Sequence, residues 1–205
     1  EHGSCPWLEP RPAGLRWAVE FYERHCAPEA MVVTALRNNP YYGPHRNAQL
    51  DAWLTFIQRC HGRYPLKFVL IGAAWEIDPR FRELPNLIVA KDYNTTVEQD
   101  LVLANSGFAY LGLPSGPWNM ALFSETPYLV FNWHSDTETV PQGAQFASCN
   151  AYQRVLWGSE TLELIETSFD ELYHRLDAAA WLQQLQARAA GLDAGRIRSQ
   201  QMWQP

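Results

Sequence analysis

Residues 31–37 read Met-Val-Val-Thr-Ala-Leu-Arg, a short apolar run that ends abruptly at a cation. An uninterrupted apolar run of this length is typical of a strand that is buried on both faces of a parallel sheet. Similar runs follow at residues 67–71, 86–90, 108–112 and 128–131. The sequence therefore predicts five strands at these places, of which the first ends in an arginine.

Helical patterns separate the predicted strands. Periodicity, capping residues and helix-ending glycines predict helices over residues 15–26, from Asn47 to Gly62, from a capping box at residues 95–98 to Gly107, and from Pro117 to Ser124. Strands that alternate with helices at this pitch form parallel βαβ units. We therefore expect an α/β protein, with a Rossmann-like open parallel sheet of about five to six strands and helices on both faces.

The last third of the chain is less regular. Residues 134–150 indicate a long loop and residues 161–165 a short strand. A capping-box pattern at residues 168–171 predicts a helix that ends at Leu176, and residues 178–190 predict another. The expected organisation is an irregular lead-in over 1–14, a Rossmann-like domain over 15–177, and a C-terminal helix and tail over 178–205.

Composition limits the classes of function. A net charge of −6 and the absence of a Lys/Arg cluster disfavour binding to nucleic acid. No apolar run approaches the roughly 20 residues of a membrane-spanning helix, and the first residues do not resemble a signal peptide. The four cysteines lack metal-site or redox spacing, which favours idle thiols and a cytoplasmic location: Cys5, Cys26, Cys60 and Cys149.

The ligand site of an open parallel sheet lies beyond the carboxyl ends of its strands. Three segments that follow predicted strands should therefore converge, at residues 37–46, 91–95 and 112–119. No Walker A sequence, G-x-S-x-G elbow, G-x-G-x-x-G fingerprint or H-E-x-x-H pair is present. The usual sequence support for a kinase, hydrolase, dehydrogenase or metalloprotease is missing.

The segment Leu-Pro-Ser-Gly-Pro-Trp-Asn at residues 113–119 joins a predicted strand to a predicted helix. Gly116 lets a ligand approach the backbone closely, and the free N–H groups and dipole of a helix start favour phosphate. The Ser115 hydroxyl and the Asn119 amide add possible hydrogen bonds. The alternative is that Ser115 merely caps the helix.

Two arginines are candidates for the same anion site. Arg37 ends the first strand, and its guanidinium presents a fork of donors that suits phosphate oxygens. Arg46 precedes the next predicted helix and is a second candidate cation. A salt bridge at a strand end is the alternative for Arg37, and a solvated helix start is the alternative for Arg46.

Several other side chains are weaker candidates. Asp92, which follows the third strand, would accept hydrogen bonds from a ribose or sugar hydroxyl, or else cap a turn. The rest have local packing or solvation as the alternative to a role in binding or base catalysis: Tyr41, Tyr42, His45, Glu125, Trp133 and the segment 134–138.

The sequence also resembles a bacterial family of predicted glycosyltransferases over about residues 28–175. The resemblance rests on Val-Thr-Ala-Leu-Arg at 33–37, a tyrosine-containing loop, and short motifs that follow it: Arg46-Asn47, Ala52-Trp53, Ser115-Gly116-Pro117 and Tyr128–Phe131. More distantly, the order of elements is similar to the nucleotide-sugar-binding (C-terminal) domain of GT-B glycosyltransferases.

This resemblance implies a nucleotide diphosphate sugar as donor substrate, held by Arg37 and a hydroxyl-bearing turn. It implies no metal and no other cofactor, because cations and a helix dipole neutralise the leaving diphosphate. In fucosyltransferases of this plan the first strand ends in His-x-Arg, and Ala35 stands where that histidine would fall. No catalytic residue is therefore carried over.

The leading hypothesis is transfer of a sugar to an unknown acceptor. A GT-B enzyme has two such domains, and this 205-residue chain begins at Glu1 instead of Met. We therefore expect a fragment whose N-terminal domain is missing, or a subunit that works with a partner. The alternatives are a non-catalytic module that binds a nucleotide sugar or supports assembly, and an enzyme that cleaves or epimerises a nucleotide sugar.

Overall fold

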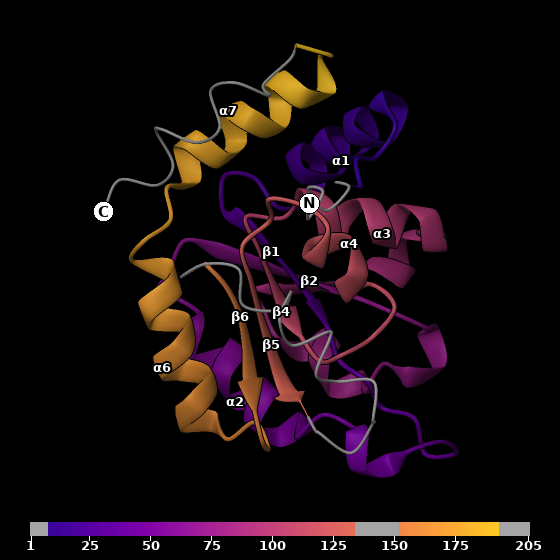
Figure 1. Ribbon diagram of the computed structural model, residues 1–205, viewed down its shortest axis with the longest axis vertical. Coiled ribbons are helices and arrows are strands. Elements are labelled where there is room, and N and C mark those ends of the chain that lie inside the picture. Colours follow the sequence, from indigo (N-terminus) through magenta and orange to yellow (C-terminus); the bar gives the residue numbers. More distant parts are fainter. Residues whose placement is uncertain (1–7, 134–151, 193–205) are drawn as a thin grey trace, which may run out of the picture.

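The computed structural model describes residues 8–133 and 152–192, and predictions that fall elsewhere, including those for Cys5, Cys149 and segment 134–138, lie outside these residues (Figure 1). Six strands form one parallel sheet in the order β3-β2-β1-β4-β5-β6. Their bounds are Ala30–Ala35 (β1), Leu66–Ile71 (β2), Leu87–Val89 (β3), Ala109–Gly112 (β4), Tyr128–Trp133 (β5) and Gln153–Trp157 (β6). This sheet confirms the expected α/β, Rossmann-like class.

The central strand is β1, which pairs with β2 on one side and with β4 on the other. Val33 lies opposite Val69 of β2 and Tyr110 of β4, and all six residues of β1 are buried. Burial on both faces explains why this strand is encoded as a continuous apolar run instead of an alternating one.

Helices cover both faces of the sheet. Their bounds are Pro12–His25 (α1), Leu50–Cys60 (α2), Val97–Ser106 (α3), Trp118–Leu122 (α4), Leu162–Tyr173 (α6) and Ala178–Ala189 (α7). Short 3-10 turns connect some of them, at Pro44–Arg46 (η1), Ala74–Glu76 (η2), Pro79–Glu83 (η3) and Ala90–Tyr93 (η4). Among the described residues, no helix has the length and apolarity needed to cross a bilayer.

Each face has its own core. Helices α2 and α6 lie together on one face, where the ring centroids of Phe56 and Phe169 are 5.3 Å apart (Figure 1). Helices α1, α3 and α4 cover the other face with residues such as Phe21 and Leu103. Helix α7 packs against α1 at the edge of this layer, where Leu185 is buried.

The C-terminal half differs from the sequence prediction. Residues 161–165 do not form a strand, because the Thr161 side chain accepts a hydrogen bond from Leu164 N at 3.2 Å and caps helix α6. Ser168 lies buried inside that helix and does not begin it. Spacings of three and four place Ile165, Phe169 and Leu172 on one buried face, so the helical period wins over the apparent strand. The sixth strand is Gln153–Trp157.

Three helix starts also differ from expectation. Helix α2 begins at Leu50, with Gln49 as its N-cap, so Asn47 does not cap it. The capping box of α3 joins Thr96 and Gln99, one residue later than expected, and both of its hydrogen bonds are present. Helix α1 begins at Pro12, since proline suits the first turn of a helix.

Candidate functional site

A pocket of about 830 Å³ opens at the carboxyl ends of the central strands. Its walls come from the segments that follow β1, β2, β3 and β4, together with the first turns of α3 and α4. Strand β1 lies between β2 and β4, so the chain order reverses at this point of the sheet. Ligands of open α/β sheets bind at such a switch point, because the two adjacent connections diverge to opposite faces and leave a crevice.

The pocket gathers five of the six residues that the sequence suggested for donor binding: Arg37, Arg46, Ser115, Gly116 and Asn119. Asp92 is not among its lining residues. Both carboxylate oxygens of Asp92 accept hydrogen bonds from Arg82, each at 2.8 Å. This ion pair, half-exposed to solvent, accounts for the position of Asp92.

Arg37 leaves the end of β1 with a defined orientation. Its Nη2 donates a hydrogen bond to the Tyr42 carbonyl, and its Cζ lies 5.7 Å from the centre of the Tyr42 ring. Its Nε is buried and has no hydrogen-bond partner in the described part of the chain. The backbone carbonyl of Arg37 accepts from Ala48 N at 2.8 Å, which ties both ends of the following loop together. Backbone and side chain are therefore both held in place, with donor capacity to spare.

Gly43 brings the two arginines close together. It has a φ of 59°, in the left-handed region that favours glycine. A Cβ atom at this position would lie 3.6 Å from Arg37 Nη2 and 3.5 Å from Arg46 Cδ. Within residues 8–133 and 152–192, neither arginine makes an ion pair with a carboxylate. The loop thus presents two unneutralised positive charges at one side of the pocket.

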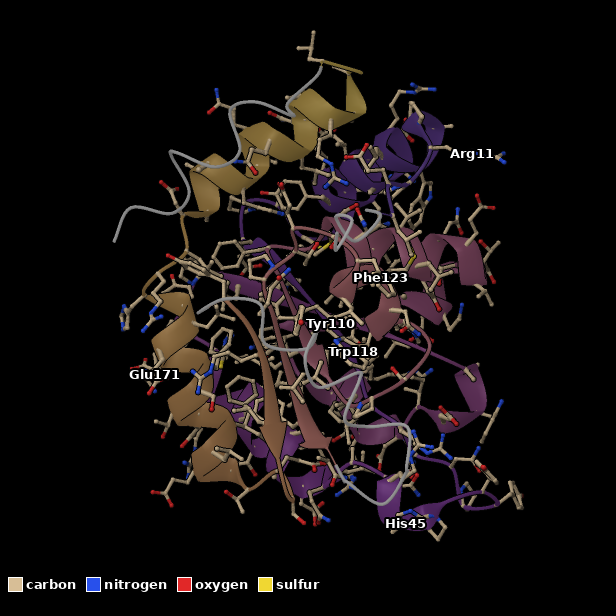
Figure 2. The ribbon with its side chains drawn as sticks, viewed as in Figure 1. Arg11, His45, Tyr110, Trp118, Phe123 and Glu171 are labelled. Carbon is tan, nitrogen blue, oxygen red and sulfur yellow. The ribbon has the colours of Figure 1, made fainter. Side chains whose placement is uncertain are left out.

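The turn after β4 forms the opposite wall. Ser115 Oγ lies 3.4 Å from the hydroxyl of Tyr110, a fully buried residue whose pKa is raised by burial. Asn119 Nδ2 donates to Gly116 O at 3.3 Å. A Cβ on Gly116 would meet nothing within 4 Å, so the described residues leave open space beside this backbone. Figure 2 shows Tyr110 and Trp118 in the interior of the molecule.

Helix α4 is shorter than the sequence suggested. It spans five residues, Trp118–Leu122, and so has little more than one turn. The dipole of so short a helix is small, because it sums few aligned peptides. Polar contacts at this turn would therefore depend on the Ser115 hydroxyl and the Asn119 amide more than on the helix.

Three charged side chains of the pocket were not singled out from the sequence, although one of them lies in the segment 91–95 that was expected to converge there. Lys91 Nζ lies 2.8 Å from Asp100 Oδ2, and both residues line the pocket with Glu76. Lys91 directly follows the predicted strand 86–90, which was a usable signal. Asp100 and Glu76 lie several residues beyond a strand end, so only the folded chain brings them here.

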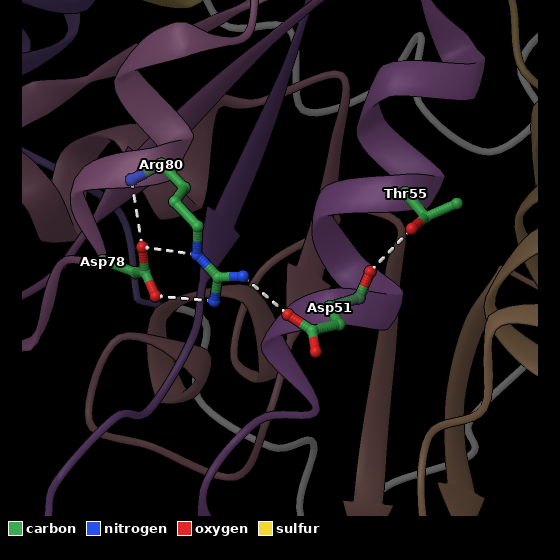
Figure 3. A network of polar contacts seen from close by, with 4 residues as sticks. All are labelled: Asp51, Thr55, Asp78 and Arg80. Atoms are coloured by element: carbon green, nitrogen blue, oxygen red, sulfur yellow. Dashed lines mark hydrogen bonds and ion pairs between the residues drawn. The ribbon is translucent and has the colours of Figure 1, made fainter.

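The segment that carries Glu76 is fixed at both ends. It leaves β2 at Gly72, whose φ of 137° suits only glycine, and Ile77 is anchored in the core. Arg80 donates hydrogen bonds to the Asp78 carboxylate from Nε at 3.0 Å and from Nη2 at 2.8 Å (Figure 3). It also donates from Nη1 to Asp51 of α2 at 2.7 Å. These bonds hold η2 and η3 in place beside α2.

The remaining candidates are not among the residues that line the pocket. His45 is exposed in η1 at the lower edge of the molecule in Figure 2, and Tyr41 and Tyr42 are exposed in the same loop. Glu125 lines a different, small cavity at the amino ends of β4 and β5. The side chain of Trp133 lies outside the described part of the chain.

Neither the cysteines nor acidic clusters add chemistry to the described residues. Burial raises the pKa of the Cys26 thiol and of the Cys60 thiol to about 12, so both stay protonated at neutral pH. In residues 8–133 and 152–192, no three His, Cys, Asp or Glu side chains are placed to hold a metal ion together.

The sheet order and its switch-point pocket define a doubly wound α/β protein. No model of a known protein family matches the sequence, and no curated protein matches it. Among solved structures, the chain is similar to E. coli ADP-heptose LPS heptosyltransferase II, with a TM-score of 0.58 and 14% identity over 89% of this chain. The match spans 55% of that enzyme's chain, so this chain corresponds to about half of it. At this identity the likeness concerns the fold alone.

Proposed function

We propose that this chain forms the donor-binding domain of a glycosyltransferase and holds a nucleotide diphosphate sugar with the diphosphate beside Arg37. The observation that carries this proposal is the convergence of Arg37, Arg46 and the Ser115–Asn119 turn on one pocket at the switch point. Two cations that have no carboxylate partner among the described residues create a local preference for an anion. A diphosphate supplies the charge and the planar oxygen pairs that guanidinium groups bind in a bidentate manner.

The proposed reaction uses this charge in its transition state. The bond from the sugar's anomeric carbon to the diphosphate oxygen breaks, and the acceptor oxygen bonds to that carbon and loses its proton. Negative charge then develops on the departing diphosphate. Arg37 is already oriented by Tyr42, so it stabilises this charge with little reorganisation.

Glu76 extends the proposed site beyond the diphosphate. It follows β2, the strand beside β1, and lines the pocket without an ion pair among the described residues. A carboxylate accepts hydrogen bonds, and the hydroxyl groups of ribose or of a sugar donate them. The negative charge of Glu76 would repel a phosphate group placed near the end of β2. It therefore limits the diphosphate to the β1–β4 side of the pocket.

The fold comparison supports the same proposal. The similar heptosyltransferase is named for ADP-heptose, a nucleotide diphosphate sugar, and it contains nearly as much chain again as the matched part. We infer that the present chain is the nucleotide-sugar-binding, C-terminal type of domain from a bacterial glycosyltransferase. The acceptor would then be bound by a further domain or a partner subunit.

Binding of diphosphates to the wild-type chain and to Arg37→Ala tests this function. Ligand at 100 times its dissociation constant should stabilise the fold by about 2.7 kcal/mol. We expect a thermal shift with nucleoside diphosphates that Arg37→Ala abolishes and Arg59→Ala, on the exposed surface of α2, retains. If no diphosphate shifts the melting temperature of the folded wild-type chain, the proposed function is wrong.

A further inference from the structure

The ion pair of Lys91 and Asp100 also lines the pocket, outside the group of residues proposed to hold the diphosphate. Lys91 lies in η4, just after β3, and Asp100 lies in the first turns of α3. Their side chains are 16% and 6% exposed, and both line the pocket. A buried ion pair often stabilises a fold no better than apolar side chains of similar volume, so stability alone does not account for this pair.

Hydrogen bonds hold the pair in place, and the contacts within residues 8–133 and 152–192 do not use all of its donors and acceptors. Lys91 Nζ donates to Thr95 O at 2.7 Å and lies 2.8 Å from Asp100 Oδ2. These two contacts use two of the three N–H donors of the Lys91 ammonium. Thr95 Oγ1 donates to Asp100 Oδ1 at 2.7 Å. The carboxylate has about four acceptor positions, so two remain. A donor and an acceptor are thus fixed side by side at the pocket wall.

The place of this pair suits a nucleobase. Lys91 lies in η4, which packs against β2 and β3, so its ammonium lies on the β2–β3 side of the Arg37 strand. With its diphosphate at Arg37, a nucleoside diphosphate would extend its ribose and base toward this side, where Glu76 also lines the pocket. Val97 and Leu101 line the same end of the pocket and supply apolar surface for the faces of a ring.

We propose that Lys91 and Asp100 read a base that carries a lactam edge, with the ammonium donating to the ring C=O and the carboxylate accepting from the adjacent ring N–H. This inference rests on the proposed nucleotide site and adds its base specificity. Guanine, hypoxanthine and uracil have that edge. Adenine and cytosine place an amino group beside an unprotonated ring nitrogen, so they bring donor to donor and acceptor to acceptor.

Two pairs of ligands that differ at this edge form the first test. Inosine and adenosine diphosphate differ there alone, and so do uridine and cytidine diphosphate. We expect the lactam member of one pair to bind at least about tenfold tighter by calorimetry. A preference within the first pair identifies a purine donor, and one within the second pair a pyrimidine donor. Equal affinities within both pairs, or a preference for the amino bases, overturn the inference.

The variant Lys91→Met/Asp100→Leu replaces the pair by apolar side chains of similar volume, an exchange that often leaves a fold intact. We expect it to lose the lactam preference and to keep the affinity for inorganic pyrophosphate. The control Arg59→Met/Glu166→Leu removes a 3.0 Å ion pair between α2 and α6 and should keep both. A loss of pyrophosphate affinity in the Lys91/Asp100 variant would instead make Lys91 part of the anion site and overturn the inference.

The same titrations separate this inference from the proposed function. If diphosphates bind in an Arg37-dependent manner but without lactam preference, the base inference alone fails. If the folded wild-type chain binds no nucleotide and no pyrophosphate, the proposed function fails and the base inference fails with it.

Discussion

Asn39 and Asn47 exchange two hydrogen bonds across the loop that carries both arginines. Asn39 N donates to Asn47 Oδ1 and Asn47 Nδ2 donates to Asn39 O, each at 2.9 Å. Asn39 Oδ1 also accepts from the backbone N–H groups of Tyr41 and Tyr42. The reciprocal bonds close the loop at its base, so its interior residues, including the carbonyl that orients Arg37, have little freedom.

Asn47→Ala should loosen this loop. Losing two partly buried hydrogen bonds lowers the free energy of unfolding by about 1–2 kcal/mol. Nucleoside diphosphate affinity should fall severalfold, since Arg37 must then be ordered on binding. Urea denaturation and calorimetry measure the two effects, with the exposed Gln58→Ala on α2 as control. Reduced stability with unchanged affinity would show that the loop closure does not position Arg37.

Gly112 and Gly116 should respond differently to alanine. A Cβ on Gly112 would lie 2.5 Å from Ala35 O, so Gly112→Ala should push β4 from β1 and lower the free energy of unfolding by about 1–3 kcal/mol. Gly116→Ala has free space and should change stability by less than about 0.5 kcal/mol. It should nevertheless weaken nucleotide binding, because the new methyl group occupies the pocket. Unchanged affinity in Gly116→Ala would argue against a ligand at this backbone.

Alkaline pH should destabilise the protein through its buried thiols. Burial raises the pKa of Cys26 and of Cys60 to about 12, above the value of an unfolded chain. The folded state therefore holds these protons more tightly, and the resulting stability is complete below pH 9 and is lost as pH rises toward 12. At pH 10 the loss is on the order of 1 kcal/mol per thiol.

Denaturation of the wild-type chain and of Cys26→Ala/Cys60→Ala at pH 8 and pH 10 isolates this effect. The variant should be less stable at pH 8 because it loses buried volume, but its stability should fall less between the two pH values. Identical pH dependence would mean that other groups account for the alkaline loss.

Thr161→Ala and Ser168→Ala test the corrected start of α6. Thr161 caps the helix, so Thr161→Ala should lower the free energy of unfolding by about 1 kcal/mol. Ser168 lies inside the helix, where alanine has the better helix propensity, and Ser168→Ala should be near neutral. Thermal denaturation of both variants tests whether the helix begins after Thr161 or at Ser168. A larger loss of stability in Ser168→Ala would favour the start at Ser168 that the capping-box pattern indicated.

The elements that sequence reasoning identified well are those whose signal is local. Strands β1 and β2 are buried on both faces and therefore appear as apolar runs, and the turn after β4 is marked by Ser115, Gly116 and Pro117. The region after β5 was harder. Helix α6 combines a cap at Thr161 with apolar residues whose first members also fit a strand, and the packing of Phe169 against Phe56 decides for the helix.

The sequence by itself determined the class of fold and the cation at the end of the first strand, because hydrophobic period and strand ends are properties of neighbouring residues. Only the tertiary structure decided which charged groups meet. In the folded chain Asp92 forms an ion pair with Arg82, and Lys91 forms one with Asp100. Hydrogen bonds between Asn39 and Asn47 close the loop that follows Arg37. These contacts join residues from different elements, and their energies depend on distance and burial, which a linear pattern does not contain.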